Sequence, residues 1–326
     1  MSISPGALRF NTDSQKLELF DGNQWTEIVA SSPDSQTGGA RGVIGGGTIQ
    51  PGSTFSNVIQ YVTISTTGNA IDFGDLSVSK TQLASCSSST RGLFAGGTTP
   101  ANSNVIDFIT ISSTGNATDF GDLTVARRSL NSSALASSTR GIFAGGDPNI
   151  NVIEYVTLAS TGDAKDFGDI SSARYSVSGC SSSTRGIFMG GSSNNVIEFI
   201  TISTLGNSVD FGDTLTSADN GGSCSNSIRG LYAATTSTNN VIEFITISTL
   251  GNSADFGDLT VIRNAATSAS SSTRGLFGGG GVGSPYTSQN VIDYVTIMST
   301  GNAIDFGDMT TGLAQGSACS NGHGGL

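Results

Sequence analysis

The chain repeats itself, and this repetition constrains its fold more than any other feature. A block that begins with Arg-Gly and, in most copies, ends with a glycine pair starts at Arg41, Arg91, Arg140, Arg185, Arg229 and Arg274. An NVI block and a DFGD block follow each copy in the same order. The copies begin 44 to 50 residues apart, an interval typical of one repeated supersecondary unit.

Each unit is rich in β-forming residues. In one unit, residues 104–111 are β-branched and aromatic, and a Gly-Asn pair favours a tight turn before residues 117–123. Small residues at 129–137 and the stretch 141–146 complete two more short strands. No segment shows the 3.6-residue period of a helix. The sequence therefore predicts an all-β fold with four antiparallel strands in each unit.

Four short strands in about 45–50 residues are typical of a propeller blade. Glycine pairs in strands mark close approach of another backbone, as occurs near a propeller axis. We therefore predict six blades. Residues 316–326 match the small-residue strand that precedes each Arg-Gly block, whereas residues 31–40 supply no such strand before Arg41. We expect the C-terminal strand to complete the first blade and leave no full-length open edge.

The charge of the chain narrows its partners. Lysine and arginine total 14 and aspartate and glutamate 25, which gives a net charge of −11. No basic run is longer than Arg127-Arg128, although phosphate and polybasic membrane contacts need clustered cations. No apolar run reaches the roughly 18 residues of a membrane span. We expect no nucleic-acid partner and no membrane insertion.

The four cysteines occupy one blade position, five residues before the repeat arginine or its equivalent. They are Cys86, Cys180, Cys224 and Cys319. Equivalent positions on different blades rarely meet disulfide geometry, and the short ligand spacings of zinc sites are absent. We interpret them as small buried thiols. Reduced thiols agree with assembly inside a bacterial cytoplasm.

The sequence predicts no catalytic residue, no cofactor and no metal ligand. His323 is the only histidine, no GxSxG-type elbow accompanies it, and we expect it to be exposed and inactive. DFGD resembles a kinase motif, but it occurs six times without the other kinase motifs. A ring of acids that binds Ca²⁺ stays open as a minor alternative, although EF-hand and RTX spacings are absent.

Most acidic residues belong to the repeat. Twelve of the 25 lie in DFGD, and five more follow NVI, namely Asp107, Glu154, Glu198, Glu243 and Asp293. We expect the DFGD carboxylates to cap turns or pair with arginine. The six repeat arginines are predicted to reach blade carboxylates as buried structural pairs, which cost roughly 3–5 kcal/mol to break.

The copies differ most in the loops after the glycine pairs. These loops cover residues 48–56, 98–103, 147–150, 235–239 and 281–289. Loops on a rigid scaffold are the usual place for recognition, and neutral variation is the alternative explanation. The candidate binding residues are Phe55, Pro100, Asn102, Asn149, Thr236, Pro285 and Tyr286.

The blade pattern of residues 41–326 resembles the kelch repeat. Four glycine pairs take the place of the kelch doublet, at Gly96-Gly97, Gly145-Gly146, Gly190-Gly191 and Gly279-Gly280. Central aromatics and inter-blade arginines resemble those of kelch at Phe108, Tyr155, Phe199, Phe244 and Tyr294, and at Arg127, Arg174 and Arg263. The kelch tryptophan is absent, with the DFGD phenylalanine in its place, and the fifth doublet is Ala233-Ala234. The resemblance implies a six-bladed kelch-like β-propeller.

Residues 1–36 form a separate candidate domain. Leu8 and Phe10 alternate with polar residues, as do Leu17 and Leu19, which predicts a β-hairpin that turns again toward Trp25. A two-stranded hairpin is marginal alone, so we expect it to dock on another chain or on copies of itself. The segment Pro5 to Ile28 resembles the GALRFNT module of tailed-phage fibre and virion proteins.

The whole chain is similar to uncharacterised virion structural proteins of marine cyanobacterial tailed phages. This resemblance implies a non-enzymatic virion protein, oligomeric on the particle. Its arm (1–36) would contact other virion proteins, and its propeller (37–326) would serve as a fibre-associated module that contacts a host-surface glycan or protein. A head or neck decoration protein without a receptor is the alternative. A propeller enzyme acting on surface glycans is a third alternative. It would need a cluster of non-repeated carboxylates, histidines or tyrosines at one mouth of the ring, and the sequence lacks such a cluster.

Overall fold

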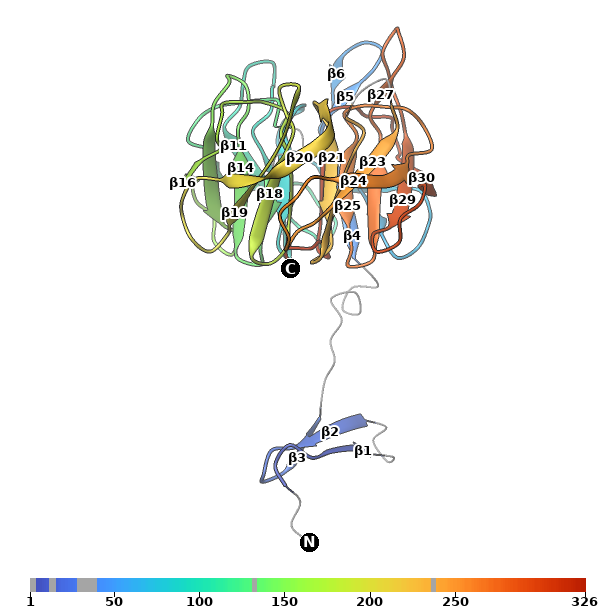
Figure 1. The fold of residues 1–326 in the computed structure, drawn as a ribbon. Helices are drawn as coiled ribbons and strands as arrows, with labels where there is room; N and C mark the ends of the chain where they lie inside the picture. The colour runs from blue at the N-terminus through green and yellow to red at the C-terminus, as the bar shows by residue number, and fades with distance from the viewer. Residues whose placement is uncertain (1–3, 12–15, 28–39, 131–133, 236–238) are drawn as a thin grey trace. The chain divides into compact units, whose positions relative to one another are not determined.

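Six four-stranded antiparallel sheets make up most of the described chain in the computed structural model (Figure 1). The structure describes residues 4–11, 16–27, 40–130, 134–235 and 239–326. All regular structure in these residues is β-strand. The described residues therefore contain no helix that is long and apolar enough to cross a membrane. The chain divides into two compact units, Met1–Gly38 and Gly39–Leu326. The boundary expected at residues 36 and 37 lies outside the described residues.

Sheets 2 to 6 of the large unit each take four strands in chain order. They are sheet 2, β9 (Ala84–Ser87), β10 (Arg91–Ala95), β11 (Val105–Thr110) and β12 (Thr118–Asp122); sheet 3, β13 (Ala134–Ala136), β14 (Arg140–Ala144), β15 (Val152–Thr157) and β16 (Lys165–Asp169); sheet 4, β17 (Ser178–Ser181), β18 (Arg185–Met189), β19 (Asn194–Thr201) and β20 (Val209–Ala218); sheet 5, β21 (Gly222–Ser225), β22 (Arg229–Ala233), β23 (Val241–Thr246) and β24 (Ala254–Asp258); and sheet 6, β25 (Thr267–Ser270), β26 (Arg274–Gly278), β29 (Val291–Thr296) and β30 (Ile304–Asp308).

Sheet 1 combines the last strand of the chain with three early ones. Its order is β31 (Ser317–Ser320), β4 (Arg41–Gly45), β7 (Val58–Thr63) and β8 (Ile71–Asp75). Ser317 lies opposite Gly45, and Ser320 opposite Gly42, in antiparallel register. The last strand therefore pairs with the first repeat block, as the sequence predicts.

The hydrophobic core lies between consecutive sheets. Each second strand buries four of its five residues, and each third strand alternates buried and half-buried positions. Six apolar clusters each join two neighbouring sheets, and one of them packs Ile44 and Val62 of sheet 1 against Leu276 and Phe306 of sheet 6. Sheets packed face to face in this way form a β-propeller-like arrangement.

The turn between the third and fourth strands of each sheet is bonded to the outer strand of the preceding sheet. Gly115 N donates to Phe73 O (2.8 Å), and Asp75 N donates to the side chain of Asn116 (3.1 Å). A side chain on Gly74 (φ +147°) would overlap Gly115, so only glycine fits there. The contact recurs at the other junctions, including Gly68 N to Phe306 O (2.8 Å) between sheets 1 and 6.

These contacts correct the role expected for the DFGD carboxylates. In the described residues the twelve DFGD carboxylates accept no hydrogen bond and form no ion pair. The main chain of the motif bonds to the next sheet instead, and its phenylalanine is buried, as Phe73 and Phe120 show. The prediction was wrong because it assigned to the side chains a contact that the backbone makes.

The small unit is a three-stranded antiparallel sheet in the order β1 (Leu8–Asn11), β2 (Lys16–Phe20) and β3 (Trp25–Glu27). Leu8 lies opposite Leu19, and Phe10 opposite Leu17, so the expected hairpin is present. The third strand was not expected. It forms because the carboxylate of Asp21 accepts hydrogen bonds from the backbone of Gln24 (2.8 Å) and Asn23 (2.7 Å), which fixes a second turn and lowers the pKa of Asp21.

Candidate functional site

Two hairpins stand above one end of the large unit and contact each other (Figure 1). One contains β5 (Thr48–Ile49) and β6 (Thr54–Phe55), and the other β27 (Gly281–Val282) and β28 (Thr287–Ser288). The hydroxyl of Ser288 donates to Thr48 O (2.9 Å) and accepts from Gln50 N (3.0 Å). We call this pair the double hairpin; it joins loops of sheets 1 and 6.

One bulky residue of the double hairpin, Tyr286, packs inward. Tyr286 donates from its hydroxyl to Asn264 Oδ1 (2.8 Å), and its ring covers Gly281 so closely that a side chain there would collide with it. Burial raises the pKa of Tyr286 to about 12. Phe55 is half-buried, whereas Pro285 is exposed. Tyr286 therefore anchors the hairpin, and its predicted role in binding stays a prediction.

Loops of sheets 2 and 3 are also tied together at the same end. The amide of Asn102 donates to Asp147 O (2.9 Å), and Asp147 pairs with Arg128 (2.8 Å). Pro100 and Asn149 are exposed beside these contacts. Thr236, the remaining candidate, lies outside the described residues. The structure thus places the loop candidates in two groups, one over sheets 1 and 6 and one over sheets 2 and 3.

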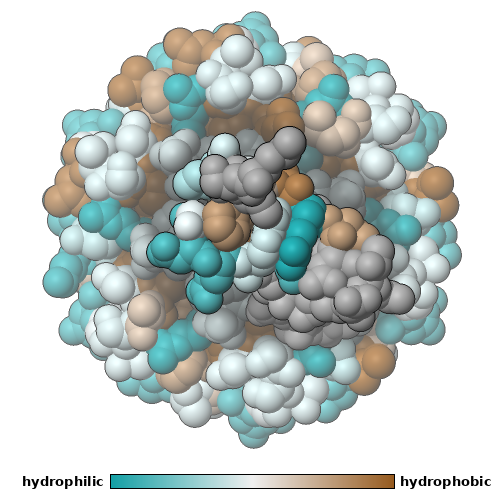
Figure 2. Space-filling view, turned by 90° about the horizontal axis from the view of Figure 1, so that it is seen from below, coloured by the Kyte–Doolittle hydropathy of each residue, from teal (hydrophilic) through white to brown (hydrophobic). Residues whose placement is uncertain are grey.

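The exposed aliphatic side chains of the large unit are dispersed over its sheets. Figure 2 views the molecule from below, and brown atoms there are scattered among white and teal ones. The most exposed aliphatic side chains of the large unit, such as Leu250 (62 % exposed) and Ile304 (59 %), come from several different sheets. Apolar residues dispersed in this way need no functional explanation.

The six repeat arginines do not pair with carboxylates, contrary to the prediction. Arg185 stacks on the ring of Phe199, with 4.4 Å from Cζ to the ring centroid, and donates from Nη1 to Ile247 O of the next sheet (2.8 Å). The same two contacts recur at Arg41, Arg91, Arg140, Arg229 and Arg274. The arginines are half-buried, so a guanidinium there needs a π face and a carbonyl, but no counter-ion.

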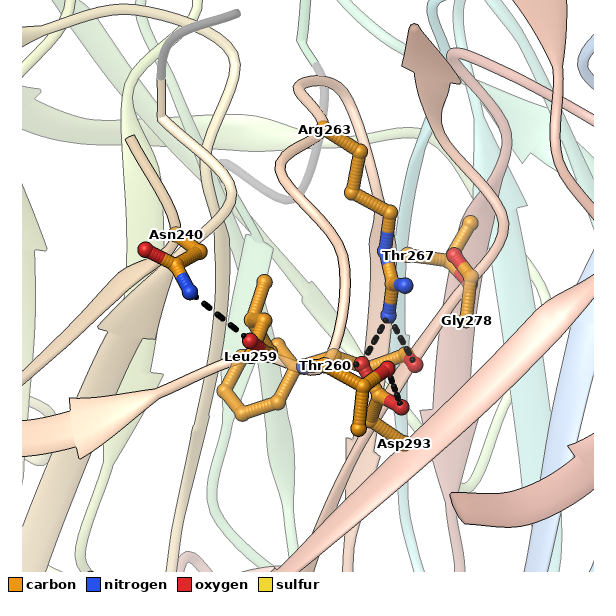
Figure 3. A network of polar contacts seen from close by, with 8 residues as sticks. Asn240, Leu259, Thr260, Arg263, Thr267, Gly278 and Asp293 are labelled. Atoms are coloured by element: carbon orange, nitrogen blue, oxygen red, sulfur yellow. Dashed lines mark hydrogen bonds and ion pairs between the residues drawn. The ribbon is translucent and has the colours of Figure 1, made fainter. Parts of the chain in front are cut away.

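Four of the five acids after NVI pair instead with cations in the linkers between sheets. Arg263 donates to Asp293 Oδ2 (2.8 Å) and to Phe277 O (3.0 Å), and Thr260 donates its hydroxyl to the same carboxylate (2.6 Å; Figure 3). The other pairs are Lys80–Asp107, Arg127–Glu154 and Arg174–Glu198.

All four pairs are buried, with both partners at most about 2 % exposed. Burial lowers the pKa of Arg263, and the charge of Asp293 opposes that change. Lys80 was missed from the sequence. The available signal was its position, five residues after the last aspartate of DFGD, which Arg127, Arg174 and Arg263 share.

The axial space between the first strands is narrow and lined by serines, cysteines and alanines. It leaves about 50 Å³ of free volume. The serine hydroxyls bond across to neighbouring strands, as in Ser181 Oγ to Ala136 O (2.7 Å) and Ser268 Oγ to Ser223 O (2.7 Å). Cys86, Cys180, Cys224 and Cys319 are buried free thiols. This space favours packing of the strands and has little room for a ligand.

His323 lies at this axial space, where the last residues of the chain pack. It is half-buried, its Nε2 is 2.8 Å from Ser87 O, and its Nδ1 accepts from Gly325 N (3.1 Å). Burial lowers its pKa, and the bond to Ser87 opposes that change. The expectation of an exposed side chain was wrong, because the glycines around it let the chain fold back between the strands.

The sheet of the small unit has two unlike faces. Arg9 stacks on Trp25 (4.2 Å to the ring centroid) and pairs with Glu18 (2.8 Å), so one face is covered by its own side chains. On the other face Leu8, Phe10 and Leu19 are 60 %, 62 % and 36 % exposed. The side chain of Leu17 lies outside the described residues.

A search for metal sites among the described residues found no group of three or more histidine, cysteine, aspartate or glutamate side chains placed to hold an ion. A scan against protein-family models found no match, and a search among curated proteins found no similar sequence.

Proposed function

We propose that the chain is a non-enzymatic structural protein of a tailed-phage particle, with a display unit and an attachment arm. The display unit is a six-bladed, kelch-like β-propeller that the last strand closes. The arm holds it on the particle through other virion proteins. The observation that carries the proposal is the uncovered apolar face of the small unit, formed by Leu8, Phe10 and Leu19.

Three independent contacts support closure of the propeller, one that pairs the two ends of the chain within sheet 1 and two that join sheets 1 and 6. The strand β31 pairs with β4, the apolar cluster of Ile44 includes Phe306, and Arg274 donates to Ile64 O (3.1 Å). The same kinds of contact join the other consecutive sheets. A ring in which each junction repeats the others needs no capping unit.

The small size of the arm supports attachment. Chains of fewer than about 40 residues rarely bury enough apolar surface to be stable without metals, disulfides or oligomerisation. An arm with one self-covered face and one bare apolar face gains stability when the bare face is buried. A virion protein or a second copy of the arm provides that surface.

The propeller serves as an adhesion or fibre-associated module in this proposal. Its repeated arginines and NVI acids are bonded within the unit, so recognition of a host-surface glycan or protein falls to the loops that differ between blades. The exposed members Pro100, Asn149 and Pro285 stand on loops that hydrogen bonds hold in place. Rigid loops lose little entropy on binding.

The test is incorporation of full-length variants into particles of the phage that encodes the chain. We expect Leu8→Ser/Phe10→Ser/Leu19→Ser to lower the particle-bound amount at least tenfold, measured by quantitative mass spectrometry of purified particles. The matched control is Ile71→Ser/Ile304→Ser, which removes equally exposed aliphatic groups from the propeller. Normal incorporation of the arm variant would contradict the proposal.

Antibody-labelled electron microscopy of the same particles separates adhesion from decoration. Label at tail or fibre tips, together with binding of the purified chain to host cells, supports an adhesion module. Label spread over the head, without cell binding, favours the decoration protein and overturns the adhesion role.

A further inference from the structure

Five of the six junctions between sheets repeat one polar arrangement, so they are controls for one another; at the sixth, between sheets 1 and 2, Asp107 is held by Lys80 alone among the described residues. At these five junctions the second residue after the DFGD motif donates its backbone N–H to the side chain that follows NVI in the next sheet, which is an acid in four of them and Gln60 in the fifth. Examples are Thr124 N to Glu154 (3.1 Å), Thr260 N to Asp293 (3.3 Å) and Leu215 N to Glu243 (2.9 Å). Glu243 therefore occupies the same anchor as its counterparts.

The junctions differ in what balances the charge of that acid. Four of them place Lys80, Arg127, Arg174 or Arg263 three residues further along the linker, and each cation pairs with the acid. Between sheets 6 and 1 the base and the acid are both replaced, by Leu313 and Gln60, so no charge is buried. Only the junction between sheets 4 and 5 keeps the acid, Glu243, and has Ala218 at the base position.

The groups that donate hydrogen bonds to Glu243 in the described residues are neutral. It is 4 % exposed, and it accepts hydrogen bonds from Ser253 Oγ (2.6 Å), Leu215 N (2.9 Å) and, at the long limit, Thr216 Oγ1 (3.5 Å). Neutral donors solvate a carboxylate but leave its charge unbalanced, and a buried unbalanced charge takes up either a proton or a counter-ion.

A second polar group on the same face of sheet 5 lacks a partner. Tyr232 lies directly opposite Glu243 in the register of β22 and β23, at a position that is phenylalanine in four other sheets. It is 1 % exposed, and its hydroxyl has no hydrogen-bond partner among the described residues. Burial raises the pKa of Tyr232, and the negative charges of Glu243 and Asp219 raise it further, whereas the nearby Ser178 hydroxyl and the positive charge of Arg174 oppose these changes. The nearby Asp219 is bound to Ser193 (2.6 Å).

We propose that Glu243 binds a monovalent cation, Na⁺ or K⁺, in the place that the Arg263 guanidinium takes in Figure 3. Its ligands are the carboxylate and the oxygens of Ser253, Thr216 and Tyr232. One carboxylate with neutral oxygens matches a single positive charge, whereas Ca²⁺ sites use six to eight oxygens and generally several carboxylates. This site is independent of the proposed role on the particle.

The test compares thermal unfolding of the full chain in NaCl, KCl and choline chloride at equal ionic strength. Choline is too large for a buried site. We expect Na⁺ or K⁺ to raise the Tm by about 2 °C or more over choline at ten times its dissociation constant. Glu243→Gln should abolish this difference. Equal Tm values in the three salts, or the same salt response in Glu243→Gln, would overturn the proposal.

Two further variants keep the test decisive if Glu243→Gln folds poorly. Ala218→Lys supplies an internal ammonium group, so it should raise the Tm in choline and remove the response to Na⁺ and K⁺. Gln60→Glu places a carboxylate opposite Leu313 and should create a second ion-dependent site with a larger salt response. A salt response that Ala218→Lys leaves intact contradicts a site at Glu243.

Discussion

The two units differ in how far their side chains are bonded to neighbouring parts of the chain. In the large unit a neighbouring sheet bonds the repeated arginines, the axial serines and the outer strand edges. The small unit leaves Leu8, Phe10 and Leu19 uncovered on its own sheet. The large unit therefore gains its stability from contacts between sheets that are far apart in sequence. The small unit has too few residues to cover its own apolar surface. One region covers most of its apolar surface itself, and the other leaves apolar surface for which we propose a partner.

The strongest way to break this comparison is to remove residues 312–326. The truncated chain loses β31, so β4 becomes an open edge and the cluster shared by sheets 1 and 6 loses Leu313. We expect the cooperative thermal transition to disappear, as measured by calorimetry. Removal of residues 1–38 is the control and should leave the transition in place. A truncated chain that melts like the full chain would show that the last strand does not close the ring.

The next largest effect is expected at the buried linker pairs. Arg263→Ala leaves Asp293 buried without its cation, which should lower the free energy of unfolding by about 3–5 kcal/mol. The double variant Arg263→Leu/Asp293→Gln copies the Leu313 and Gln60 junction and should recover most of that loss. Denaturant unfolding of the three proteins measures both changes. A double variant no more stable than Arg263→Ala would mean that charge balance is not what the pair supplies.

The sequence predicts the strands better than the partners of the polar groups. Periodicity identifies four strands in each unit and the position of the last strand, because apolar alternation and glycine turns act over a few residues. The groups that an arginine side chain contacts depend on the distance between neighbouring sheets. The spacing of the repeats in the sequence gives no information about that distance. Arg185 was therefore assigned to a carboxylate although it bonds to Ile247 O.

The linker site is less evident still. In the sequence Lys80 looks like an ordinary surface residue. Its role becomes visible only when the junctions are aligned on the DFGD motif, because Lys80, Arg127, Arg174 and Arg263 then share one position. The vacancy at Ala218 becomes visible only when Glu243 is known to be buried. Single residues that break a repeat are thus better guides to a site than the repeated ones.

Substitution of a repeat arginine should cost less than loss of a buried pair. Arg185→Ala removes one cation–π contact and one hydrogen bond from a half-buried position. We expect a loss of about 1–2 kcal/mol. Arg185→Lys keeps the positive charge without the planar guanidinium, so this control should recover only part of the lost stability. An unchanged Tm in Arg185→Ala would show that these contacts add nothing to the junction.

A smaller effect is expected from pH at His323. Burial lowers the pKa of His323 in the folded chain below its usual value near 6.5, so the unfolded chain takes up the proton first as the pH falls. The stabilising contribution is complete above about pH 6.5 and declines below it. The contact from Gly325 N to Nδ1 also requires an unprotonated nitrogen. His323→Gln should lose less Tm than the wild type between pH 7.5 and 5; equal losses would place the pH dependence elsewhere.

The smallest expected effect sharpens the comparison between the two units. Leu8→Ser/Phe10→Ser should change the unfolding free energy of the large unit by no more than about 0.5 kcal/mol, because substitutions far from a packed core rarely do more. Differential scanning calorimetry of the full chain measures the transition of the large unit directly. If the variant lowered that transition, the apolar face of the arm would be buried on its own propeller. The surface that we assign to a virion partner would then be an internal contact, and attachment would have to be sought on another part of the chain.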